Sequence, residues 1–284
     1  MLHKDACSLL PYRLLATLWL VVALALAAGM AAAAQPNTLG GETRRLALVV
    51  GNADYSYAPL RNPVNDARAM RQTLERLGFT VIAVENADLP TLLDALRRFS
   101  LEARRHDVRL FYYAGHGVQV EGRNYLIPVG TEIAGDDEIA RKGADMTLLT
   151  EQLGRLEDGL NILILDACRN NPFRDAAIKT ADGRVIRFRG QTQSGLAAMD
   201  APKGTLVAFS TAPGAVAMDG QNQRNSLYTK HLIAHIATPG LPVEQLFKRV
   251  RVAVAQETQR LQIPWESSSL MGDFCFIPSD GGLC

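Results

Sequence analysis

The chain has 284 residues, of which 48% are hydrophobic and 21% are charged. This length can bury a sizeable core, and these proportions are those of a globular domain, which excludes a disordered chain. The formal net charge is +1, and beyond residue 34 the basic and acidic residues balance at 28 each. A nucleic-acid-binding surface needs a clustered excess of Lys and Arg, so we expect no nucleic-acid partner.

Residues 1–34 are typical of a targeting segment. Lys4 and Arg13 precede an uncharged run of 21 residues, 14–34, which begins apolar and ends in alanines. A basic start, an apolar centre and a small-residue end predict a cleaved secretory signal peptide. The alternative is an uncleaved anchor, because a run of this length can span a bilayer. Both interpretations predict an exported domain, periplasmic or secreted, with no other membrane contact.

Export would leave three cysteines in the mature chain, Cys168, Cys275 and Cys284. In an oxidising compartment an odd number of cysteines indicates an unpaired thiol. Cys275 and Cys284 are nine residues apart and could close a small loop, which would leave Cys168 free. The alternative is three reduced, buried cysteines.

Short apolar runs alternate with amphipathic segments from residue 45 onward. Strands are predicted at 45–51, 79–84, 108–114, 160–165 and 205–210, with shorter ones at 124–128 and 274–277. Helices are predicted at 63–77, 90–103, 147–156, 226–236 and 242–259, where apolar residues recur at steps of three and four. This alternation is typical of an α/β fold with a mainly parallel sheet and helices on both faces. We expect one domain over residues 44–278.

Residues 169–203 interrupt this pattern. They contain Pro172, three glycines and five arginines, without apolar periodicity. We expect a long exposed loop, and such loops within compact domains are usually functional or disordered.

Two of the predicted strands lead into residues that carry chemistry. One runs into His116, flanked by Gly115 and Gly117, and another runs into Cys168. The carboxyl ends of parallel strands form the site edge of a sheet, so we expect His116 and Cys168 to lie close together. Each alone is more often structural, but the pair suits nucleophilic catalysis, in which the imidazole takes the thiol proton. The backbone N–H groups of Gly117 and Cys168 could stabilise the oxyanion.

The segments 112–117 and 165–169, with their His and Cys 52 residues apart, resemble those of the caspase-like cysteine peptidases. They are most similar to the metacaspase and bacterial caspase-like branch, as is the helix start at 62–67. The resemblance covers about residues 44–278 and implies a six-stranded caspase-haemoglobinase sheet, a Cys–His dyad and endopeptidase activity on protein or peptide substrates. Asn170 stands where the caspase motif usually has glycine.

The resemblance also suggests a substrate pocket. In the metacaspase branch an acid two residues before the nucleophile helps to bind a basic P1 side chain, and Asp166 occupies that position. Arg61 lies near the place where animal caspases have an arginine that binds P1 aspartate. We favour a basic P1 residue, because a carboxylate attracts Arg or Lys and repels Asp. The alternative role for Asp166 is to cap nearby backbone N–H groups.

The sequence contains no strong metal-binding motif. His231 and His235 are four residues apart but lack the glutamate of the H-E-x-x-H motif. Metacaspases often need calcium, and residues 136–138 and Asp175 are candidate ligands, although their spacing is not that of an EF-hand. We therefore expect no cofactor, with calcium as the open alternative. Trp265 is expected in the core or a pocket wall.

These observations predict an exported cysteine endopeptidase, a hydrolase of the caspase-like class. The alternative is a catalytically silent caspase-like module that binds a partner through the same cleft. If the enzyme prefers basic P1 residues, its own basic loop becomes a substrate. We therefore also expect self-cleavage after a basic residue between Lys179 and Arg189.

Overall fold

The computed structural model describes residues 43–156, 158–168, 177–179, 185–187, 196–212, 217, 223–282 and 284. The chain divides into two units, residues 1–41 and 42–284, and every described residue belongs to the second. The predicted targeting segment, residues 1–34, lies outside the described residues. Within the part of the chain that is described, no helix is long and apolar enough to cross a membrane.

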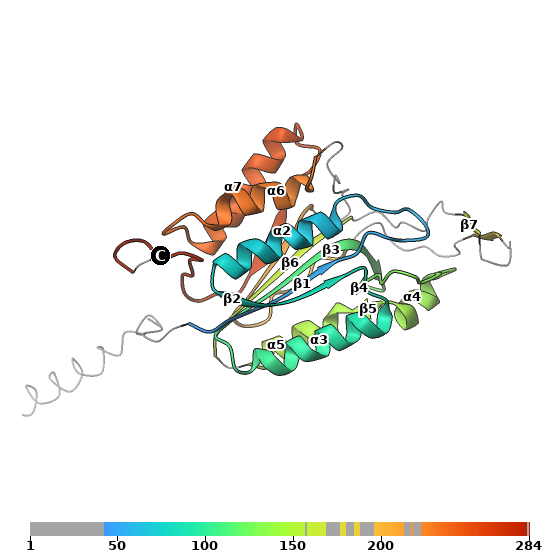
Figure 1. Cartoon of the computed structure of the whole chain (residues 1–284), viewed down its shortest axis with the longest axis horizontal. Coiled ribbons are helices and arrows are strands. Elements are labelled where there is room, and N and C mark those ends of the chain that lie inside the picture. The colour runs from blue at the N-terminus through green and yellow to red at the C-terminus, as the bar shows by residue number, and fades with distance from the viewer. Residues whose placement is uncertain are drawn as a thin grey trace, which may run out of the picture. The chain divides into compact units, whose positions relative to one another are not determined.

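A mixed β-sheet forms the centre of the domain, with strand order β10-β9-β6-β3-β1-β2 (Figure 1). The strands are β1 (Arg45–Gly51), β2 (Phe79–Glu85), β3 (Val108–Val120), β6 (Leu160–Cys168), β9 (Thr205–Phe209) and β10 (Trp265–Ser268). Neighbouring strands pair in parallel, except that β10 is antiparallel to β9. The predicted α/β fold with a mainly parallel sheet is confirmed.

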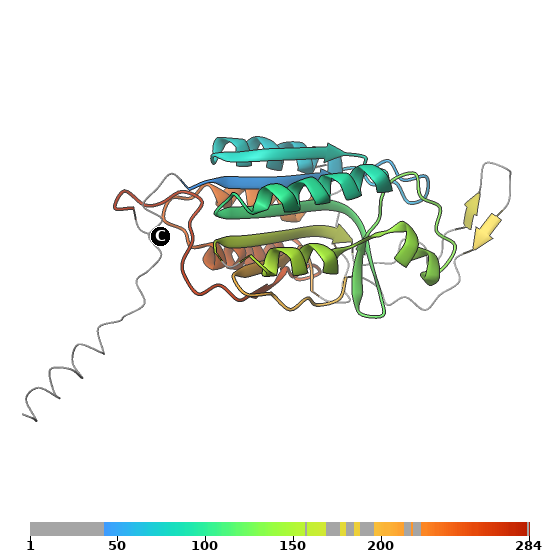
Figure 2. The same ribbon diagram turned by 90° about the horizontal axis from the view of Figure 1, so that it is seen from below.

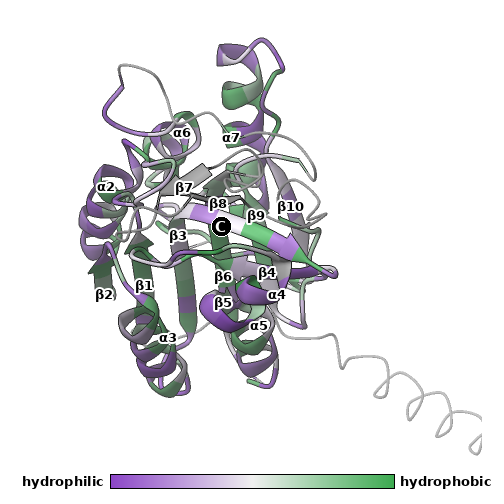
Figure 3. Ribbon diagram, turned by 90° about the vertical axis from the view of Figure 1, so that its right-hand side faces the viewer, coloured by the Kyte–Doolittle hydropathy of each residue, from purple (hydrophilic) through white to green (hydrophobic). Residues whose placement is uncertain are grey.

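Helices cover both faces of this sheet (Figure 2). One face carries α2 (Pro63–Arg76), α6 (Leu227–Ile236) and α7 (Val243–Glu257), and the other carries α3 (Leu89–Ala103) and α5 (Met146–Gly154). Alternate strand residues supply two separate cores. In β1, for example, Ala47 and Val49 pack toward α2, whereas Leu48 packs toward α3. Burial on both faces explains why the central strands read as near-continuous apolar runs, which Figure 3 shows in the hydrophobic colour.

A small hairpin extends from the central sheet. The last residues of β3 pair with β4 (Arg123–Leu126), which in turn pairs with β5 (Ala144–Asp145). Between β4 and β5 lies α4 (Asp136–Lys142), a helix that begins with the candidate calcium ligands at 136–138. The i,i+4 ion pairs Asp137–Arg141 and Glu138–Lys142 help to stabilise this helix.

The predicted strand at 274–277 is wrong. Cys275 forms an isolated bridge with Pro242, and the last strand of the sheet is β10. Trp265, expected in the core or a pocket wall, opens β10 and is 48% exposed. An edge strand has one row of unpaired backbone groups and more contact with solvent, so β10 lacks the apolar run of a central strand.

The segment predicted as a structureless loop, residues 169–203, contains regular structure. Strands β7 (Ala177–Lys179) and β8 (Val185–Arg187) pair antiparallel as a separate two-stranded sheet. Later in this segment, Leu196 is buried, and the backbone N–H and carbonyl of Ala197 form hydrogen bonds with the side chain of Asn124.

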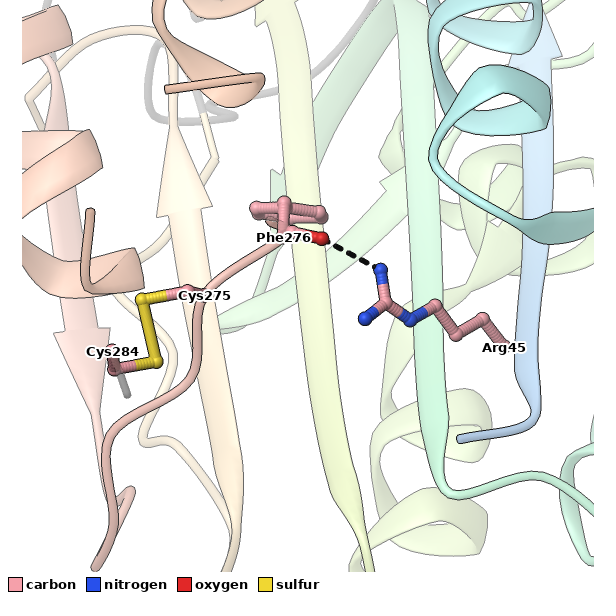
Figure 4. The surroundings of a disulfide bond; sticks show 4 residues. All are labelled: Arg45, Cys275, Phe276 and Cys284. Atoms are coloured by element: carbon pink, nitrogen blue, oxygen red, sulfur yellow. Dashed lines mark hydrogen bonds between the residues drawn. A yellow bond between two sulfur atoms is a disulfide. The ribbon is translucent and has the colours of Figure 1, made fainter. Parts of the chain in front are cut away.

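Cys275 and Cys284 form a disulfide with a Cα–Cα distance of 5.3 Å, as the sequence analysis anticipated (Figure 4). The carbonyl of the neighbouring Phe276 accepts a hydrogen bond of 2.8 Å from Arg45 at the start of β1. The disulfide therefore fixes a segment that packs against the amino end of the central sheet. For a sequence separation of nine, the chain-entropy model gives a stabilisation of about 2.6 kcal/mol.

Candidate active site

The two predicted catalytic residues occupy adjacent positions in the central sheet. His116 in β3 and Cys168 in β6 are register partners, so their backbones are about one strand spacing, ~4.8 Å, apart. The sequence analysis ended the strand at residue 114, but β3 continues through His116 to Val120. The histidine is therefore held by a strand on one side and a hairpin on the other. For Cys168 the description covers the backbone alone.

The imidazole of His116 is buried between aromatic rings. Its exposed fraction is 4%, and its ring centroid lies 4.4 Å from that of Tyr55 and 6.3 Å from that of Tyr57. Burial lowers the pKa of His116 to about 4, although the hydrogen bond to the Ala58 carbonyl opposes this shift. The ring is therefore neutral at pH 7 and can accept a proton.

One hydrogen bond decides which nitrogen of His116 is basic. Nε2 lies 2.8 Å from the carbonyl oxygen of Ala58. A carbonyl can only accept, so in the neutral ring Nε2 carries the proton and Nδ1 carries the lone pair. Nδ1 is buried and has no hydrogen-bond partner among the described residues. The geometry thus leaves Nδ1 as the proton acceptor.

The two glycines beside His116 make room for other side chains. A Cβ atom at Gly115 would lie 2.7 Å from the Tyr113 hydroxyl and 2.8 Å from the Tyr55 hydroxyl. A Cβ atom at Gly117 would lie 2.9 Å from a methyl carbon of Leu196. Gly117, the predicted oxyanion donor, lies in β3 opposite Leu126 of β4.

Asp166, the predicted pocket acid, lies in β6 two residues before Cys168 and is 8% exposed. Its Oδ2 accepts hydrogen bonds from the hydroxyls of Ser226, at 2.5 Å, and Thr229, at 2.8 Å. Both donors belong to the beginning of α6, where Ser226 is the N-cap. Both of these bonds come from side-chain hydroxyls.

A second carboxylate, which the sequence analysis missed, shares Ser226 with Asp166. Asp66 is 1% exposed in the first turn of α2, and its Oδ1 accepts from the Ser226 N–H at 3.0 Å and from Asn225 at 2.8 Å. Burial is the main cause of the raised pKa of Tyr112, and the nearby Asp66 and Asp166 raise it further. Both carboxyl groups therefore lie near the Tyr112 side chain. Two buried carboxyl groups therefore lie near the carboxyl end of β6.

Arg61, the alternative pocket residue, is exposed in the segment that joins β1 to α2. It is three residues from Ala58, whose carbonyl holds His116. The structure thus places Arg61 in the segment that borders the site, while Asp66 and Asp166 lie beneath α6.

The described residues contain no group of three or more side chains suited to hold a metal ion. Of the candidate calcium ligands, Glu138 accepts hydrogen bonds from Lys142 and from the Ala134 N–H, and Asp137 pairs with Arg141. Asp175 lies outside the described residues.

Of the two histidines of α6, His231 forms an ion pair with a carboxylate. His231 Nε2 lies 2.6 Å from Glu257, which also binds Lys230. Lys230 is the first cause of the lowered pKa of Glu257, about 2.

The sequence analysis did not identify two groups of the site, the Asp66 carboxylate and the Ala58 carbonyl. Asp66 lies in the first turn of α2, the helix that follows β1, and an acidic residue near a helix start in the sequence is the signal that could have found it. The Ala58 carbonyl is a backbone group and leaves no trace in the sequence.

Comparison with known proteins identifies the family to which the chain belongs. A family model described as caspase domain matches residues 44–275. The chain is 27% identical over 143 residues to mucosa-associated lymphoid tissue lymphoma translocation protein 1 of Homo sapiens, covering 50% of this chain and 17% of that protein. It is 25% identical over 232 residues to caspase-1 of Rattus norvegicus, covering 78% of this chain and 56% of that protein. The chain thus matches less than two thirds of the length of either relative.

Proposed function

Because the chain belongs to the caspase domain family, we propose that it is a cysteine endopeptidase with Cys168 as nucleophile and His116 as general base. The observation that carries the proposal is the register of His116 with Cys168, combined with a ring proton fixed on Nε2. Fold alone does not establish activity, so the proposal depends on these two features. Proteins or peptides are the proposed substrates.

The proposed reaction follows from the tautomer of His116. Nδ1 takes the thiol proton of Cys168, and the thiolate attacks the carbonyl carbon of the scissile peptide. The backbone N–H groups of Gly117 and Cys168 stabilise the oxyanion. Nδ1–H then gives its proton to the leaving amine, and water hydrolyses the acyl-enzyme with His116 as base again. Throughout, Nε2–H remains bonded to the Ala58 carbonyl and holds the ring in place.

We propose further that the S1 pocket prefers Arg or Lys. Support comes from the two buried carboxylates, Asp66 and Asp166, which receive hydrogen bonds from neutral groups of Asn225, Ser226 and Thr229. A guanidinium or ammonium group of the substrate would complement two carboxylates at this place. Arg61 is exposed, and an exposed charge selects its partner less strongly than a buried one.

We also propose that the domain acts outside the cytoplasm. The Cys275–Cys284 disulfide supports this, because disulfides persist in oxidising compartments. Its pairing leaves Cys168 as the cysteine available for catalysis among the three beyond residue 34.

The test compares wild type with Cys168→Ala and His116→Ala on fluorogenic peptides with Arg, Lys or Asp at P1, with and without calcium. His235→Ala serves as the matched histidine control, since His235 lies in the last turn of α6, at the opposite end from Ser226 and Thr229. Loss of cleavage in the two site variants, with activity kept in the control, supports the dyad. Retention of a tenth of the activity by Cys168→Ala contradicts it, and failure of wild type both to cleave and to react with a thiol probe supports a silent module.

Asp166→Asn tests the pocket separately. Removing one partner of a charge-assisted pair costs about 1.5–3 kcal/mol, so kcat/KM for Arg substrates should fall about 10- to 100-fold. Cleavage of a slow ester substrate with a small P1 group should be nearly unchanged. A preference of the wild type for Asp at P1 would instead indicate that Arg61, and not Asp166, binds the P1 side chain.

A further inference from the structure

The last rung of the β3–β4 ladder is built differently from an ordinary antiparallel rung. Gly117 lies opposite Leu126, so the next pair is His116 with Ile127. The Ile127 N–H donates to the His116 carbonyl at 3.0 Å, as a ladder requires. The return bond is made through Tyr55, whose hydroxyl accepts from the His116 N–H at 3.0 Å and donates to the Ile127 carbonyl at 3.0 Å.

A second tyrosine completes the arrangement. The Tyr113 hydroxyl donates to the His116 carbonyl at 2.7 Å and lies 3.3 Å from the Tyr55 hydroxyl. Both backbone polar groups of His116 are therefore bound to phenolic hydroxyls. Glycine at 115 is what admits these hydroxyls, because a Cβ atom there would lie less than 3 Å from each.

The inserted hydroxyl separates β3 from β4 at the position of the histidine. A direct rung would bring the His116 N–H within about 2.9 Å of the Ile127 carbonyl, whereas the relay places one oxygen between them. The Tyr55 ring also packs on the imidazole, with centroids 4.4 Å apart. The segment that carries Tyr55 carries Ala58 as well, so one stretch of chain fixes both the backbone and the ring of His116.

We propose that Tyr55 is a positioning residue for His116, acting through the hydroxyl that it inserts between His116 and Ile127. The inference rests on the proposed function, since positioning matters only if His116 is the base. The Tyr55 hydroxyl is already bound to the His116 N–H and the Ile127 carbonyl. It therefore affects the reaction through the histidine.

The test is Tyr55→Phe, which removes the hydroxyl and keeps the ring. Tyr125→Phe is the matched control, because Tyr125 is a buried tyrosine of the same hairpin, on β4, outside this rung. We expect Tyr55→Phe to lower kcat about 10- to 100-fold, since small misplacements of a catalytic group have effects of this size. KM should stay unchanged, and Tyr125→Phe should keep wild-type kcat.

A double variant separates positioning from general damage. On the residual rate of His116→Ala, the further change Tyr55→Phe should have no effect, because the residue acts through the missing imidazole. An additional loss in that background would overturn the proposal, as would wild-type kcat in a folded Tyr55→Phe protein.

Two measurements do not depend on turnover. In wild type, hydrogen exchange at the His116 amide should be strongly slowed, and exchange at the rate of an unprotected amide would overturn the proposal even if Tyr55→Phe does not fold. Nitrogen NMR of the His116 ring should show the Nε2–H tautomer in wild type and a mixture of tautomers in Tyr55→Phe. If wild type cleaves no peptide but these two results hold, the proposed function fails while the positioning of His116 stands.

Discussion

Burial of His116 makes the stability of the domain depend on pH. The pKa of His116 is lowered from 6.5 to about 4, with burial as the leading cause. As the pH falls below 6.5, the unfolded chain binds a proton at this position while the folded protein does not. The resulting stability is present in full above 6.5 and is lost as the pH falls toward 4.

The magnitude follows from the size of the shift. The two pKa values of His116 differ by 2.5. Relative to high pH, protonation of the unfolded chain therefore lowers the free energy of unfolding by about 3 kcal/mol at pH 4 and by almost nothing at pH 7.5. His116→Gln removes the titration and keeps an amide that can still donate to the Ala58 carbonyl. The other groups titrate in both proteins and cancel in the comparison.

The assay is urea unfolding of Cys168→Ala, which prevents self-digestion, with and without His116→Gln, at several values between pH 7.5 and 4. We expect the variant to gain about 3 kcal/mol relative to its parent across this range. His235→Gln is the control and should show a much smaller change, because His235 is only partly buried. A constant difference between His116→Gln and its parent would refute the reasoning.

Two further predictions concern stability and the rung. Cys275→Ser should lower the free energy of unfolding by about 2.6 kcal/mol, and added reductant should destabilise wild type to the same extent without affecting the variant. An unchanged urea midpoint would contradict this. Gly115→Ala should cost about 1–3 kcal/mol and lower kcat, because its methyl group displaces two hydroxyls. Gly78→Ala, with open space around its Cβ, is the comparison, and equal kcat losses in both would contradict the prediction.

Much of the fold could be predicted because its central strands are buried on both faces. Continuous apolar runs identified β1, β3, β6 and β9, and helical periodicity identified the helices that cover them. The failures fall on elements without such patterns. Strand β10 lies at the edge and mixes Trp265 with polar residues, whereas Phe274 and Phe276 look like a strand but pack as loop residues against Phe79 and each other.

The site was predictable to the extent that strand ends define it. Register placed His116 beside Cys168, as the strand-end argument required. The sequence could not indicate that β3 continues past His116, because the continuation depends on pairing with β4. It also could not indicate the Ala58 carbonyl or the Tyr55 hydroxyl, since both come from a segment between β1 and α2 whose path is set by tertiary contacts.

The segment after Cys168 provides the last prediction. If the pocket selects basic residues, we expect the enzyme to cut itself after a basic residue between Lys179 and Arg189, with no cut in Cys168→Ala. A peptidase binds its substrate as an extended, unpaired backbone, and Lys179 and Arg187 are paired within β7 and β8. Cleavage should therefore avoid the bonds after these two paired residues, and amino-terminal sequencing of the fragments identifies the bond. A fully active enzyme that remains one chain contradicts self-processing, and cuts after Asp182 or Asp200 would instead assign the pocket to Arg61.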